Sequence, residues 1–137
     1  MSSFSIFDIA GSGMSAQSVR LNTVASNLAN ADSISGDPTQ VYRAKHPVFQ
    51  AVAPTPTDPA SAGVKVLGVT ESTADPERRY EPGNPLADAQ GYVYAPSVNV
   101  VEQMVDMISA SRAYQNDVEV MNTARNLMLA TLKLGQS

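Results

Sequence analysis

Two glycines near the N-terminus have the spacing of a nucleotide-binding turn. Gly11, Gly13 and Ala16 fit the pattern G-x-G-x-x-A and follow an apolar run. In a dinucleotide-binding fold such a turn follows a buried strand, opens a helix and precedes a second strand that ends in an acidic residue about 20 residues later. The polar, turn-forming run DSISGDPTQ stands where that second strand is needed. A dinucleotide-binding oxidoreductase-like protein therefore stays an alternative interpretation and not the favoured one.

The other polar residues form no recognisable catalytic or metal-binding motif. His46 is the only histidine and the chain has no cysteine, so a thiolate metal site is excluded and a catalytic triad would depend on one imidazole ring. Residues 75–81 mix acidic and basic side chains among turn formers, and we interpret them as a solvated surface loop. Asp88 we interpret as a residue that bends a loop. The sequence predicts no enzyme, no cofactor and no metal site.

Composition excludes further classes of protein. The 137 residues carry a net charge of −4, whereas a nucleic-acid-binding domain needs a clustered basic surface. No run of 18 apolar residues is present, so we expect no membrane span. The N-terminus lacks the basic and apolar regions of a cleavable secretory signal. The length suits one domain.

The positions of the prolines predict the organisation of the chain. All nine prolines lie between Pro38 and Pro96. Because proline is disfavoured inside helices, we expect helices in residues 1–35 and 98–137 and a different structure in residues 36–97. Within this insert, residues 41–52, 64–71 and 91–95 have strand-like patterns, and residues 53–63 resemble a mobile loop. The predicted fold is mainly α with a small β insert, its long terminal helices pairing as a coiled-coil-like hairpin.

Apolar residues recur at helical spacing in both terminal segments. They are Phe7, Met14, Leu21, Val24 and Leu28 in the first segment, and Met104, Met107, Tyr114, Val118, Met121, Met128 and Leu132 in the second. Gly11 and Gly13 interrupt the first helix, where each costs about 1 kcal/mol relative to alanine, so its first turns are expected to be weak or bent. Asn99 is predicted to cap the second helix and Gly135 to end it.

These twelve apolar residues are the predicted assembly interface. A helix over residues 100–134 would be about 50 Å long, which exceeds the core of so small a domain. It must pair with the first helix, with other chains, or with both. A simple intramolecular helical hairpin stays open at this point.

Several longer stretches resemble a known family. SGMSAQSVRLNTVASNLANAD (residues 12–32) resembles the N-terminal signature of flagellar rod and hook proteins. VYRAKHPVF (residues 41–49) and the run from EPGNPLADAQGYV to NTARNLML (residues 81–129) are similar, more narrowly, to the proximal-rod members of that family. The run DSISGDPTQ departs from the threonine-containing link that is usual after the ANA triplet.

The resemblance implies a structural subunit that passes unfolded through the flagellar type III export apparatus without a cleaved signal. It would polymerise through its terminal helices into a helical tube, the periplasmic rod, and transmit torque. Implied partners are copies of itself, other flagellar rod proteins, the rod-to-ring junction protein and the export apparatus, with no nucleic acid. Another type III-secreted helical-pair component is an alternative, although such chains are usually shorter and lack the insert.

Overall fold

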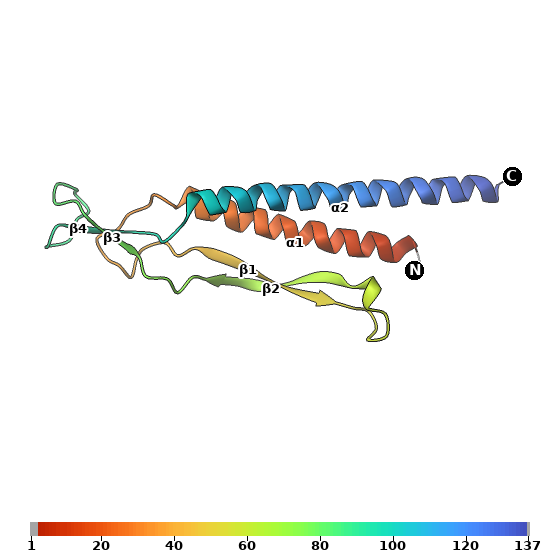
Figure 1. The fold of residues 1–137 in the computed structure, drawn as a ribbon, viewed down its shortest axis with the longest axis horizontal. Helices are drawn as coiled ribbons and strands as arrows, with labels where there is room; N and C mark the ends of the chain where they lie inside the picture. The colour runs from red at the N-terminus through yellow and green to blue at the C-terminus, as the bar shows by residue number, and fades with distance from the viewer. Residues whose placement is uncertain (1–2, 137) are drawn as a thin grey trace.

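The computed structural model describes residues 3–136 and consists of two long helices with two short strand pairs between them (Figure 1). Helix α1 (Ser3–Ala29) and helix α2 (Val100–Gly135) lie side by side and run antiparallel. Strands β1 (Lys45–Val52) and β2 (Gly63–Glu71) form an antiparallel hairpin, whose connection contains the short 3-10 helix η1 (Pro59–Ser61). Strands β3 (Glu77–Tyr80) and β4 (Tyr92–Ala95) form a second antiparallel pair. The predicted class, mainly α with a small β insert, is confirmed.

Helix α1 is the middle layer of the molecule. The α2 helix packs along one side of it and the β1–β2 hairpin along the other, whereas the β3–β4 pair lies beyond the end of the helices, opposite the C-terminus (Figure 1). Small apolar side chains supply most of the buried core, among them Ala10, Ala16, Val24, Ala31, Ala44, Ala110 and Ala124. Because α1 is covered on two sides and α2 on one, α2 keeps an uncovered outer side.

The glycine pair lies inside a continuous helix. Gly11 and Gly13 both fall within α1, which begins at Ser3 and continues through both glycines without a turn. A dinucleotide fold requires strand, turn and helix in that order. The alternative interpretation as a nucleotide-binding turn is therefore wrong, because the helical pattern of the flanking residues prevails over the local glycine spacing.

The boundaries of α2 agree with its predicted signals. The side-chain oxygen of Asn99 accepts a hydrogen bond from the backbone amide of Glu102 (3.2 Å), so the predicted N-cap is confirmed. The helix ends at Gly135, as predicted. The next residue, Gln136, has right-handed helical dihedral angles, so this end lacks the left-handed cap that a terminal glycine commonly provides.

The insert contains one strand that the sequence did not reveal. Residues 75–81 are mostly exposed, as expected of a solvated surface segment, but the prediction of a loop is wrong, because Glu77–Tyr80 forms β3 and pairs with β4. The Arg78 guanidinium lies 3.6 Å from the centre of the Tyr92 ring, which is close enough for a cation–π contact. Charged residues can occupy such an exposed strand because its partner, and not its own hydrophobicity, holds it in place.

A tight loop connects β3 to β4. The Asp88 carboxylate accepts hydrogen bonds from the backbone amides of Gln90 and Tyr92, both at 2.9 Å. The bond from the Tyr92 amide is the main cause that lowers the pKa of Asp88 below its ordinary value. Gly91 has a φ of +86°, which permits the turn back into β4. The interpretation of Asp88 as a loop-bending residue is confirmed.

Candidate assembly interface

The structure places the twelve predicted interface residues at different depths within the single chain. Val24 is buried and most of the others are half-buried, namely Phe7, Met14, Leu21, Leu28, Met107, Tyr114, Val118, Met121 and Met128. Met104 and Leu132 are instead exposed on α2. The predicted set therefore includes residues that the chain covers by itself and residues that it leaves open.

Small and polar residues on α2 are buried more deeply than its large apolar ones. Gln103, Ala110 and Ala124 are its buried residues, and they are spaced by multiples of seven. Small side chains let two helix axes approach closely, while larger side chains flank the contact. Sequence reasoning missed these positions because it followed the large apolar residues, although the seven-residue spacing was visible in the sequence.

Asp117, in the same seven-residue series, lies against a glycine of α1. A methyl group on Gly13 would stand 2.6 Å from the Asp117 Oδ2 atom, which is too close for the present arrangement. Burial raises the pKa of the Asp117 carboxyl. Among residues 3–136 this carboxylate has no hydrogen-bond or ion-pair partner. Gly13 therefore leaves the space in which an acidic side chain of α2 is accommodated.

This geometry predicts opposite results at the two glycines of α1. Gly11→Ala is expected to stabilise the chain by roughly 1 kcal/mol, because alanine favours a helix and nothing lies within 4 Å of the new methyl group. Gly13→Ala is expected to lose this gain, because the methyl group displaces Asp117. Urea unfolding followed by helical circular dichroism measures both variants. A gain of equal size in Gly13→Ala would contradict the prediction and would show that the Asp117 carboxylate moves aside at no cost.

Polar contacts also connect α1 and α2. Arg20 forms an ion pair with Asp106, in which its Nε donates at 2.9 Å. The Asn27 side chain donates to the Gln103 side chain at 2.9 Å. These directional contacts can form at only one alignment of the two helices along their axes, whereas apolar contacts can form at several alignments.

The outer side of α2 carries an exposed apolar stripe. Val101, Val105 and Ile108 are 71%, 62% and 58% exposed. Their i, i+4, i+7 spacing puts them on one face of the helix. We call these three residues the outer stripe. Exposed apolar side chains that share one helix face form a candidate interaction surface. The spacing was visible in the sequence, but its exposure was not.

The last turns of α2 are also apolar and exposed. The helix extends beyond the start of α1, so no helix of the described residues 3–136 lies beside its last turns (Figure 1). Its exposed apolar residues are Leu129, Leu132 and Leu134. Leu127, also exposed, lines a pocket with Ile6 near the start of α1. A helix segment that is apolar on several sides is stable in water only when neighbours cover it.

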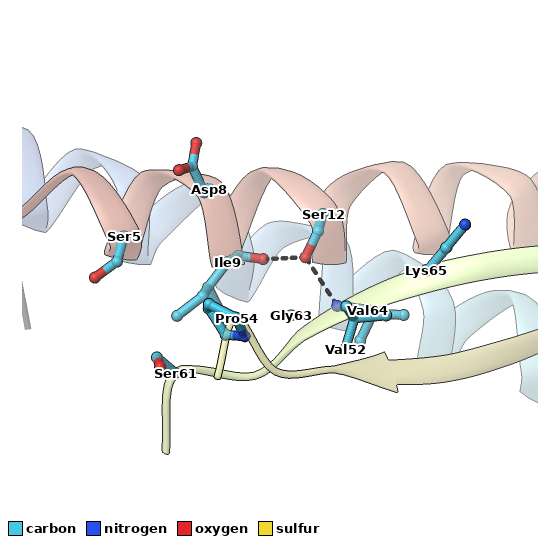
Figure 2. A pocket seen from close by; sticks show the side chains of 10 residues that line it. All are labelled: Ser5, Asp8, Ile9, Ser12, Val52, Pro54, Ser61, Gly63, Val64 and Lys65. Atoms are coloured by element: carbon cyan, nitrogen blue, oxygen red, sulfur yellow. Dashed lines mark hydrogen bonds between the residues drawn. The ribbon is translucent and has the colours of Figure 1, made fainter. Parts of the chain in front are cut away.

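An apolar groove lies between the first turns of α1 and the end of the hairpin (Figure 2). It has a volume of about 340 Å³, and its apolar walls include Ile9, Val52, Pro54 and Val64. The Ser12 hydroxyl donates to the Ile9 carbonyl (2.7 Å) and accepts from the Val64 amide (3.0 Å), which ties hairpin to helix (Figure 2). Among residues 3–136, no three histidine or acidic side chains are grouped to hold a metal ion.

No helix in the described part of the chain combines the length and apolar character that a membrane span requires. The exposed apolar residues of α2 are interspersed with Glu102, Arg112, Glu119 and Arg125.

Comparison with known proteins agrees with this arrangement. The model of the family described as flagella basal body rod protein matches residues 7–33. The model described as flagellar basal body rod FlgEFG protein C-terminal matches residues 89–134. These two regions contain most of the paired helices.

Comparison with full-length relatives identifies one family among the flagellar rod proteins. The flagellar basal-body rod protein FlgC of Escherichia coli O6:H1 is 58% identical over 136 residues, which cover 99% of this chain and 100% of the relative. FlgC of Salmonella typhimurium is 57% identical with the same coverage. FlgC of Buchnera aphidicola from Acyrthosiphon pisum is 39% identical over 138 residues, again with 99% and 100% coverage.

The chain belongs to the FlgC family of flagellar basal-body rod proteins. It is a structural subunit of the rod in the flagellar basal body. The resemblance stated from the sequence is thus confirmed, and the alternative of a different type III-secreted component is not supported.

Proposed function

We propose that this subunit polymerises through its terminal helices into the helical tube of the proximal rod, which transmits torque across the periplasm. The observation that carries the proposal is the outer stripe on α2, an exposed apolar face on the side that α1 does not cover. The exposed leucines at the end of α2 extend this surface. Under the proposal the function is mechanical and requires no catalytic step.

The twelve predicted interface residues divide into two roles under this proposal. The buried and half-buried residues form a coiled-coil-like seam between α1 and α2, which gives the subunit a rigid rod-like core. Exposed Met104 and Leu132 join the outer surface that contacts neighbouring subunits. Residues 36–97 form an insert between the two terminal regions, 1–35 and 98–137, and its β1–β2 hairpin packs on α1.

A subunit with different apolar surfaces on different sides suits an open assembly. When one surface binds another surface of the next copy, and the rotation between copies does not close a ring, the product is a helical filament. Each apolar Å² removed from water contributes roughly 25 cal/mol, offset by the cost of immobilising the subunit. A few exposed apolar residues at each contact can therefore stabilise the assembly when each copy has several neighbours.

The proposed partners are copies of this chain, other flagellar rod proteins and the rod-to-ring junction protein. The flagellar type III export apparatus would deliver the chain to the periplasm without removal of a signal peptide. Membership of the FlgC family supports these partners.

The test introduces charge on the outer stripe. The double variant Val105→Asp, Ile108→Asp is expected to be exported normally but to be absent from basal bodies, and its cells are expected not to swim. Both positions are exposed, so circular dichroism of the purified variant should match the wild type. The measurement is complementation of a strain lacking the gene, with immunoblots of secreted protein and purified basal bodies.

Gln115→Asp is the matched control, because Gln115 continues the same face of α2, is exposed and is already polar. This variant should support swimming. Incorporation of the Val105→Asp, Ile108→Asp subunit into basal bodies would contradict the proposed use of the outer stripe.

A further inference from the structure

One buried amide of α1 contacts both the start of the insert and α2. Asn27, on α1, is 1% exposed. Its Oδ1 accepts hydrogen bonds from the Lys45 backbone amide (2.8 Å) and the Tyr42 hydroxyl (2.9 Å). Its Nδ2 donates to the Lys45 carbonyl and to the Gln103 Oε1 atom, both at 2.9 Å. These four bonds use both acceptor positions and both donors of the amide.

The Asn27 side chain makes the hydrogen bonds to Lys45 that a neighbouring strand would otherwise make. Lys45 is the first residue of β1 and pairs with Glu71 of β2. The amide and carbonyl of one strand residue point to the same side. Because Asn27 bonds both groups of Lys45, it covers the β1 edge at that residue, where the two-stranded hairpin has no further strand. The hairpin is thereby attached to α1 by main-chain groups, which side-chain substitutions in β1 do not remove.

The contact with Gln103 connects the same amide to α2. Gln103 lies in the first turns of α2 and is itself buried. Tyr42 extends this hydrogen-bond network to Ser26, because the two hydroxyl groups lie 3.0 Å apart. A hydrogen-bonded network of this kind is favourable only when every member is satisfied, since an unpaired buried polar group costs stability. The network is therefore formed as a unit.

We propose that Asn27 is the positioning residue that couples the hairpin to the helix pair. It holds the start of β1 and the start of α2 at one place on α1, so the β1–β2 hairpin and the outer stripe keep a fixed relation within each subunit. This role rests on the fold of the single chain and does not depend on the proposed polymerisation.

Asn30 provides a matched comparison on the same helix. Its side-chain amide donates to the Ser26 carbonyl at 2.9 Å, which is a local contact in α1. The substitutions Asn27→Asp and Asn30→Asp are isosteric and each removes the donating amide. Only Asn27→Asp places a carboxylate opposite the Lys45 backbone carbonyl, which can only accept a hydrogen bond and so loses its donor.

The test is hydrogen–deuterium exchange of the purified full chain. In Asn27→Asp, exchange is expected to rise at least tenfold both in β1 and in the first turns of α2. In Asn30→Asp, both regions should stay within about twofold of the wild type. A rise confined to α1, equal effects of the two variants, or a wild-type β1 without protection would each overturn the proposal.

A second variant tests the coupling where Asn27→Asp fails to fold. Gln103→Met keeps the side-chain length but removes the acceptor on α2. We expect faster exchange of the Lys45 amide, although Gln103 makes no hydrogen bond to Lys45, because the effect passes through Asn27. Unchanged exchange at Lys45 would show that the hairpin and α2 are held independently, and would overturn the proposal.

Discussion

Replacing Leu21 or Met121 with aspartate is expected to abolish incorporation into the rod and to leave export of the chain intact. Leu21 on α1 and Met121 on α2 are half-buried in the folded chain. A carboxylate there must be desolvated without a partner, or must separate the helices, at a cost of roughly 3 kcal/mol. Export acts on an unfolded chain under the proposed mechanism, so it should not be affected.

The neighbouring asparagines are matched controls for this prediction. Asn22→Asp and Asn122→Asp introduce the same carboxylate one residue further along each helix, at exposed positions. Swimming in soft agar, immunoblots of secreted subunit and the composition of purified basal bodies distinguish the four variants. Normal swimming of the Leu21→Asp and Met121→Asp cells would contradict the assignment of these residues to the packing surfaces.

Gly91→Ala is expected to destabilise the β3–β4 pair by roughly 2 kcal/mol. The φ of +86° at Gly91 is strained for alanine. A methyl group at this position would also lie 3.0 Å from Tyr80 Cε2 and 3.1 Å from Pro82 Cβ. Amide exchange of β4, which contains the fully buried Val93, measures the loss.

Gly83→Ala is the control in the same loop. No atom lies within 4 Å of a methyl group at Gly83, and its φ is not positive. This substitution should change the protection of β4 little. If both variants change the amide exchange of β4 equally, flexibility of the loop, and not the conformation of Gly91, determines the stability of the β3–β4 pair.

The sequence by itself determined the two terminal helices and the position of the insert. Proline is incompatible with helix interiors, so its confinement to residues 38–96 left both ends free to be helical. The cap at Asn99 and the strands near residues 45–52 and 63–71 follow from local chemistry, which is written in neighbouring residues. The family resemblance was equally visible in the longer motifs.

Only the tertiary structure decided which apolar residues are covered. Helical spacing places a residue on a face but does not say whether that face meets another element, so exposed Val105 and half-buried Met121 cannot be distinguished by pattern. Strand β3 exists because β4 pairs with it, and Asn27 is saturated because Lys45 and Gln103 are brought to it. These contacts join residues distant in the chain, and local patterns carry no information about such pairings.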